Sequence, residues 1–165
     1  MELSELFDYK NLLMEDLCSN ERIAKLVTGN DEAQVPNHGL PYTQIFPYEY
    51  IPETIDESKT FICYDVDVLS VPNKTFLIPV LYVWVFTHKS RMRENGGGVL
   101  IDDLSIEVSK MLNGNRNYGL GELDLDSVRR FTPIAGFLGR ALTFYAKDFN
   151  RNGSKPAPAT RRSKV

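Results

Sequence analysis

Two hydrophobic runs in the middle of the chain predict a β-hairpin. From residue 60 to residue 70, Ile62 and Tyr64 begin a hydrophobic series that alternates with Asp65 and Asp67, the period-two pattern of a half-buried strand. After a turn, residues 76–87 are hydrophobic at odd and even positions alike, so both faces of this strand are expected to be covered. One side carries Leu77, Leu81, Val83 and Val85, and the other carries Phe76, Ile78, Val80, Tyr82, Trp84 and Phe86.

Hydrophobic positions spaced three and four residues apart predict helices. The first spans residues 3–17. A short second helix follows between Asn20, whose side-chain oxygen can cap it, and Gly29, which suits the left-handed position after a helix. A third helix is expected over residues 100–112, closed by Gly114.

The remaining segments complete an α+β fold. Four prolines mark residues 30–58 as a long connection, in which residues 42–50 are candidates for a short edge strand. Two β-like runs, residues 120–133 and 137–149, predict a second hairpin. The expected order is therefore N-terminal helix, antiparallel hairpin, helix and second hairpin, with a helix packed on one sheet face. The second face is left for the N-terminal helices, the proline-rich connection or a neighbouring subunit.

The chain divides into three expected regions. Residues 1–29 form an N-terminal helical arm, residues 30–149 an α+β core domain that includes the connection, and residues 150–165 a basic, extended C-terminal arm. That C-terminal arm has no acidic residue and almost no hydrophobic one, so it cannot build a core of its own. Its cations are Arg151, Lys155, Arg161, Arg162 and Lys164.

Composition limits the classes of function. With 165 residues, of which 42% are hydrophobic, the chain has the size of one globular domain. A net charge of −3 gives no general attraction to nucleic acid, so any contact with DNA is local and non-specific. Cys18 and Cys63 lie far apart in the sequence and are expected to be reduced and buried. No signal-peptide pattern or membrane-spanning stretch is recognised, so we expect no membrane partner and a cytoplasm-like compartment.

The sequence contains no recognisable catalytic or metal-binding motif. His38 and His88 lack the setting of a catalytic base, and His88 fits better at the end of a strand. Asp65 and Asp67 share a strand face, which favours a solvated or subunit-facing acidic surface over a cation site. The glycine segments lack the spacing of phosphate-binding loops. We therefore expect neither enzymatic activity nor a metal or cofactor.

Several short segments resemble the tail terminator and neck (tail-completion) proteins of long-tailed phages. The resemblance covers roughly residues 5–150 and rests on the element order together with residues 60–68, 85–90, 112–116 and 147–150. It implies a ring, usually of six subunits, on the head-proximal end of the tail tube, which stops tube growth and presents a surface to the head–tail connector or stopper. The protein would then reside in the virion neck, after assembly in the host cytoplasm, with DNA passing through the ring.

The resemblance assigns hypothetical roles to residues that chemistry leaves open. The subunit interface is expected at Leu81, Val83, Val85, Asp65 and Asp67. The loop with Arg91, Arg93, Gly96, Gly97 and Gly98 is expected to line the lumen or to dock on a partner, and the C-terminal arm to contact a neighbouring subunit or ring. Other phage structural roles stay open, namely a head-completion or connector adaptor, a tube subunit or a baseplate component. A small enzyme or a DNA-binding module would need a polar pocket or a larger basic face.

Overall fold

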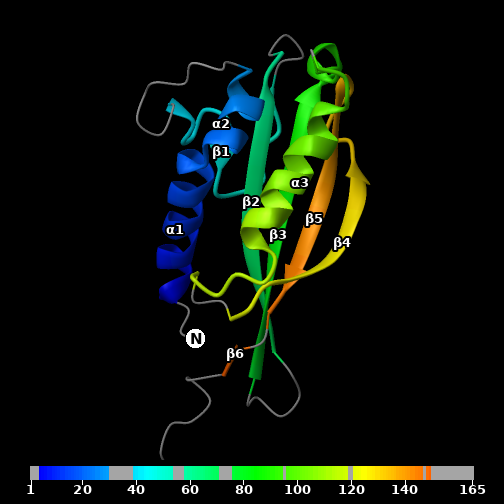
Figure 1. Ribbon diagram of the computed structural model, residues 1–165. Helices are drawn as coiled ribbons and strands as arrows, with labels where there is room; N and C mark the ends of the chain where they lie inside the picture. The colour runs from blue at the N-terminus through cyan, green and yellow to red at the C-terminus, as the bar shows by residue number, and fades with distance from the viewer. Residues whose placement is uncertain are drawn as a thin grey trace, which may run out of the picture.

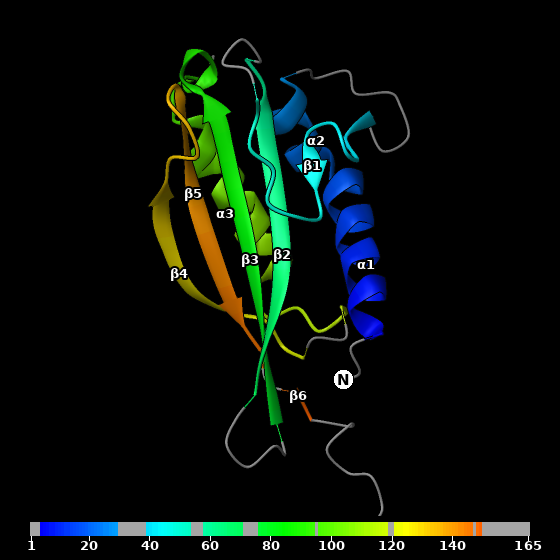
Figure 2. The same cartoon turned by 180° about the vertical axis from the view of Figure 1, so that it is seen from behind.

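The protein is a two-layer α+β structure with its helices on one face of a mixed sheet. The computed structural model describes residues 4–29, 39–53, 58–70, 76–94, 96–118, 121–146 and 148–149. Figures 1 and 2 show the three helices on the same side of the sheet, which confirms the predicted fold class. The helices are α1 (Glu5–Ser19), α2 (Glu21–Thr28) and α3 (Leu100–Leu112), with a short 3-10 helix η2 (Lys89–Arg91). The strands are β1 (Ile45–Phe46), β2 (Thr60–Ser70), β3 (Phe76–His88), β4 (Asp124–Phe131), β5 (Phe137–Tyr145) and β6 (Asp148–Phe149).

The sheet has the order β1-β2-β3-β5-β4, and β6 pairs separately with β3. Both predicted hairpins are confirmed, because β2 pairs antiparallel with β3 and β4 pairs antiparallel with β5. The expected edge strand in residues 42–50 is β1, which lies parallel to β2. The run predicted over 137–149 was too long, since β5 ends at Tyr145 and residues 148–149 pair with the start of β3 instead.

The N-terminal helices belong to the main core and do not project from it as an arm. Leu13 and Leu17 of α1 and Ile23 of α2 are buried in one cluster with Ile62 of β2. The predicted caps of α2 are confirmed. The Asn20 side chain accepts hydrogen bonds from the backbone N–H groups of residues 22 and 23, and Gly29 has a φ of 74°.

The described helices pack on only one of the two hydrophobic sides of β3, and that side lies in the main core. Leu81, Val83 and Val85 point toward the helices, and at most 1% of each is exposed. Their expected role as a subunit interface is therefore wrong for the folded chain, because a second subunit cannot contact side chains that the helices already cover. Any interface on this strand must use the opposite face.

Among the described residues, a second small core covers one end of that opposite face. Phe46, Phe61, Phe86 and Phe137 form a small separate core there, against which Tyr50 packs. Gly139 of β5 allows this close packing, since a Cβ at that position would lie 2.1 Å from the Val85 carbonyl oxygen. The segment after β1 thus closes one end of this face, and none of the described helices lies over the rest of it (Figure 2).

Candidate functional site

The part of the sheet that no described helix covers is the first candidate for a contact surface. We call it the open face, and it carries Tyr82 and Trp84 of β3, whose rings stack with centroids 5.8 Å apart. Trp84 is half-buried, and Leu69 and Tyr145 on neighbouring strands are 48% and 37% exposed. Exposed aromatic and aliphatic side chains on a sheet face are typical of a surface that another protein covers.

The two aspartates of β2 have different surroundings. The Asp65 carboxylate lies 2.6 Å from the Lys10 ammonium group of α1 and also accepts a hydrogen bond from the Val66 N–H. It therefore helps to hold α1 against the sheet edge. Asp67 is exposed on the open face. Both predicted interface acids are accessible to another subunit, but the Asp65 side chain, which is 43% exposed, is already paired with Lys10.

A pocket lies at the far end of the open face, beside the end of β5. We call it the end pocket. It has a volume of about 540 Å³ and is lined by Leu69, Ile78, Glu122, Asp124, Tyr145 and Ala146. Its wall is hydrophobic, whereas Glu122 and Asp124 are exposed carboxylates. Glu122 also forms an ion pair with Arg116.

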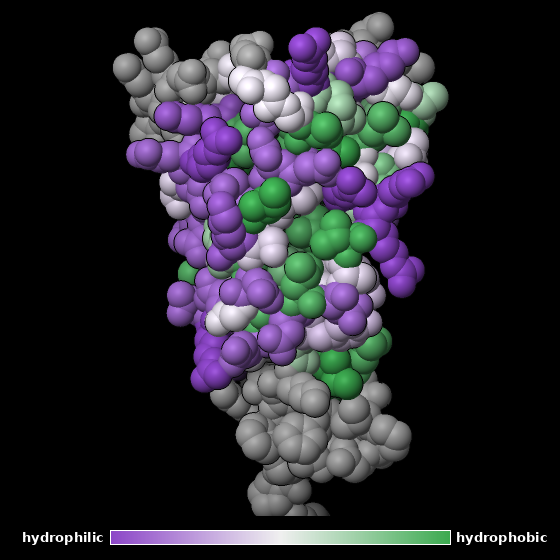
Figure 3. Space-filling model, turned by 45° about the vertical axis from the view of Figure 1, so that its right-hand side comes forward, coloured by the Kyte–Doolittle hydropathy of each residue, from purple (hydrophilic) through white to green (hydrophobic). Residues whose placement is uncertain are grey.

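A hydrophobic groove runs between α3 and the edge strand β4. We call it the side groove. Its lining includes Ile106, Leu125 and Val128, and the volume is about 400 Å³. Ile106 and Val128 are 50% and 47% exposed. Figure 3 shows hydrophobic side chains gathered on this side of the molecule with hydrophilic ones around them. Within the described residues, no strand pairs with the outer edge of β4.

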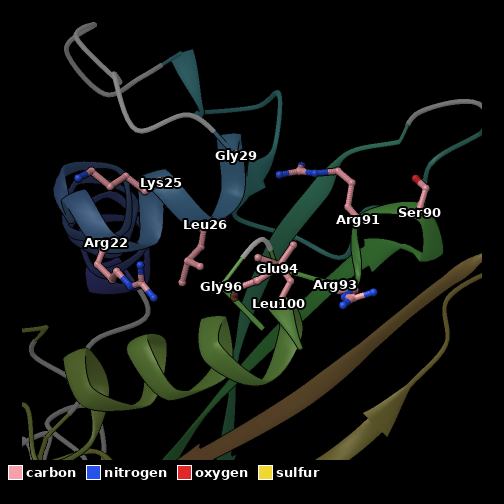
Figure 4. Close-up of a pocket in the computed structure, with 10 residues that line it drawn as sticks. All are labelled: Arg22, Lys25, Leu26, Gly29, Ser90, Arg91, Arg93, Glu94, Gly96 and Leu100. Atoms are coloured by element: carbon pink, nitrogen blue, oxygen red, sulfur yellow. The ribbon is translucent and has the colours of Figure 1, made fainter. Parts of the chain in front are cut away.

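The predicted docking loop borders a third pocket, between α2 and the start of α3 (Figure 4). We call it the loop pocket. It has a volume of about 420 Å³, and its ten lining residues include four cations, one carboxylate and one of the three loop glycines. The cations are Arg22, Lys25, Arg91 and Arg93. Sequence reasoning found the last two but missed the two from α2, which are brought close only by the tertiary fold.

The cations of the loop pocket do not converge on one point. Arg91 reaches toward Gly29, and its Nη1 donates a 3.0 Å hydrogen bond to the carbonyl oxygen of Val27, whereas Lys25 extends in another direction (Figure 4). Burial lowers the pKa of the Arg91 guanidinium. Arg91 therefore ties η2 to the end of α2, and the arrangement does not favour a phosphate site.

The glycine segment forms a tight turn. The Gly97 N–H donates to the Glu94 carbonyl oxygen at 3.1 Å, and Arg93 and Val99 form an isolated β-bridge. Gly97 and Gly98 have φ angles of 84° and 122°, a region that favours glycine. Next to the turn, desolvation and a hydrogen bond with Asp103 raise the pKa of the Glu94 carboxyl, while Arg22 opposes the shift.

His88 and the two cysteine residues considered as catalytic or metal-binding candidates make contacts that stabilise the fold. His88 ends β3, as expected, and its ring packs against Phe137 while Nδ1 lies 2.7 Å from the Ser90 hydroxyl oxygen. Cys18 and Cys63 are free and buried, as expected. In the described part of the chain, no group of three or more His, Cys, Asp or Glu side chains is placed to hold a metal ion.

Some of the expected contacts involve residues outside the part of the chain that the structure describes. The expectation of no membrane partner concerns the described helices. The predicted contacts of Arg151, Lys155, Arg161, Arg162 and Lys164, and any role of His38, lie outside the described residues. None of the helices in the described ranges has the length and hydrophobicity needed to span a bilayer.

The fold and these surfaces define a class of protein, a two-layer α+β domain whose candidate sites are contact surfaces on the sheet face, the sheet edge and one loop. The profile of the YomW family matches residues 20–146, from the cap of α2 to the end of β5. The chain belongs to the YomW family, which is phage-derived, and is thus a phage-associated protein. No curated protein matches it.

Proposed function

We propose that this chain is a structural protein of the phage neck that acts without catalysis. In this proposal it forms a ring on the end of the tail tube, ends tube polymerisation and joins the tail to the head connector. The phage-derived family supports a phage setting, and the order of helices and hairpins agrees with the resemblance to tail terminator proteins. The ring, its number of subunits and its partners belong to the proposal.

The side groove is the observation that carries the proposal. A closed ring needs two different surfaces on each subunit, because every subunit contacts its neighbours in a head-to-tail manner. Ile106 and Val128 offer a hydrophobic surface beside the unpaired edge of β4. The open face with Tyr82 and Trp84 offers a second, different surface. A monomer would gain nothing from leaving both exposed to water.

Growing tail tubes provide the test. Tube subunits are polymerised with and without the purified chain, and tube lengths are measured by electron microscopy. We expect the chain to bind at one end and tube growth to stop. Tubes that continue to elongate with the protein bound at their ends would refute the terminator function.

Other phage structural roles share the same supporting observations. A head-completion or connector adaptor, a tube subunit or a baseplate component would also need exposed contact surfaces. These alternatives differ from a terminator in their position in the particle. A tube subunit would be found along the whole tail, and a baseplate component at the end distal to the head.

A further inference from the structure

We propose that the end pocket binds the C-terminal segment, residues 151–165, of a second copy of this chain. Each subunit would then hold a neighbour through its tail as well as through its folded domain. This inference rests on the proposed function, because it requires copies of the chain to assemble.

The end pocket has the chemistry to bind a basic, extended peptide. Leu69, Ile78 and Ala146 provide a hydrophobic wall, and Glu122 and Asp124 provide negative charge next to it. Asp67 adds to this charge, because it lies on β2 two residues before the pocket residue Leu69 and on the same face of that strand. Hydrophobic contact combined with opposite charge is the usual basis for peptide capture.

The C-terminal segment matches this surface in charge and backbone preference. Residues 151–165 contain five cations and no carboxylate side chain. Pro156 and Pro158 favour an extended backbone, which suits binding along an open pocket. The complementary charges steer the segment to the pocket, and the proline residues reduce the entropy lost on binding.

The direction in which the chain leaves the sheet favours binding of the C-terminal segment to the end pocket of a second copy over binding to the pocket of its own chain. Ala146 lines the end pocket, and Asp148 and Phe149 then pair with Leu77 and Phe76 in that order. The chain is therefore moving toward the first residue of β3 and away from Ile78, the pocket residue on that strand. Fifteen residues span up to about 50 Å when extended, so the segment can reach a neighbour.

Zero-length cross-linking of the full-length chain tests the inference. Chains with natural and with ¹⁵N nitrogen are mixed and treated with a carbodiimide, which joins a carboxylate to an amine in direct contact. Lys155 and Lys164 are the only lysines of the segment. We expect links between chains from these lysines to Glu122. Asp124→Asn should reduce the Glu122 link on the order of three- to tenfold, because one of the carboxylates that attract the basic segment is lost.

The matched control is Asp126→Asn, which removes the same charge from an exposed residue of β4 outside the pocket. The Glu122 link should survive this change. Equal losses in both variants would indicate general attraction to an acidic surface, and links found only within one chain would indicate self-binding. Either result overturns the inference. If the chains assemble and stop tube growth without any link to Glu122, the inference fails and the proposed function stands.

Discussion

At the scale of single residues, Gly139 is a position where the structure has no room for a side chain. It lies on the open side of β5 opposite Phe86, and a Cβ there would come within 2.1 Å of the Val85 carbonyl oxygen and 2.6 Å of the Phe86 Cβ. Backbone atoms of the central strand cannot move aside without breaking sheet hydrogen bonds. Glycine at this position is thus required by packing and not by its φ angle.

We expect Gly139→Ala to lower the free energy of unfolding by more than about 3 kcal/mol, above the usual cost of overpacking. Urea denaturation followed by circular dichroism measures the change. Gly96→Ala is the control, because no atom lies within 4 Å of a Cβ at that position. A Gly139→Ala protein as stable as the Gly96→Ala protein would contradict the packing of β5 on β3.

The two buried thiols make stability depend on alkaline pH. Burial raises the pKa of Cys63 to about 12 and that of Cys18 to about 11, from an ordinary value of 9.0. Their pKa is higher in the folded than in the unfolded chain, so the stability they contribute is fully present below pH 9 and is lost as the pH rises through 11 to 12. Burial also raises the pKa of Tyr64 and Tyr118, which acts in the same direction.

The urea midpoint should therefore be flat between pH 7 and about pH 8.5 and fall at higher pH. At pH 8 in the absence of urea, a thiol reagent such as DTNB should react with neither Cys18 nor Cys63, and with both after unfolding. Rapid reaction of either thiol in the native protein would show that this cysteine is accessible to solvent and would contradict its burial in the structure.

At the scale of elements, the stability of α2 depends on its N-cap residue, Asn20. The Asn20 side chain accepts from two backbone N–H groups at 3.1 Å each, whereas Ser4, at the same position of α1, makes no such side-chain bond. Because unsatisfied N–H groups at a helix start are costly, the two positions should differ in importance. Arg91 holds the other end of α2 through Val27.

Asn20→Ala should destabilise the protein by about 1 kcal/mol, within the range of about 0.5–2 kcal/mol for lost caps. Ser4→Ala is the matched control and should change stability little. Both are measured as shifts in the urea midpoint. Equal effects of the two substitutions would mean that the Asn20 cap does not form in solution.

Local patterns in the sequence predicted the helices and strands well, but they did not predict which face of β3 packs against the helices. The alternation around Asp65 and Asp67 identified β2, and helical spacing identified α2 and α3. Both sides of β3 are hydrophobic, so the pattern of this strand alone did not show that Val83 faces the helices while Trp84 faces outward. That choice depends on where α1 and α2 pack, which is set by contacts such as that of Lys10 with Asp65, 55 residues apart.

The candidate surfaces were predictable in part. Glycines and arginines at residues 91–98 marked a loop that does border a pocket, yet Arg91 is used inside the fold. The side groove was missed, although Ile106 breaks the helical spacing of the buried positions of α3 and was a usable signal. The second half of the groove, Val128, comes from a strand whose place beside α3 is known only from the tertiary structure.

At the scale of the whole molecule, the helices cover one face of the sheet, and among the described residues no helix covers the other face and no strand pairs with the outer edge of β4. Such a subunit is expected to associate. We expect Val128→Lys to weaken self-association, measured as mass in solution over a range of concentrations, because it places a charge in the hydrophobic groove. Its stability should change by no more than about 0.5 kcal/mol, because the residue is half exposed.

Asn11→Lys is the matched control for this variant, since it adds the same charge on the exposed surface of α1, away from the groove. It should leave the mass in solution unchanged. If both variants assemble like the natural chain, the side groove is not the contact between subunits, and the open face becomes the surface to examine.

The position of the protein in the phage particle tests the central proposal most directly. Purified virions are labelled with a gold-conjugated antibody against this chain and viewed by electron microscopy. We expect label at the junction of head and tail. Label along the tube, at the distal end of the tail, or absent from the particle would contradict a role in the neck.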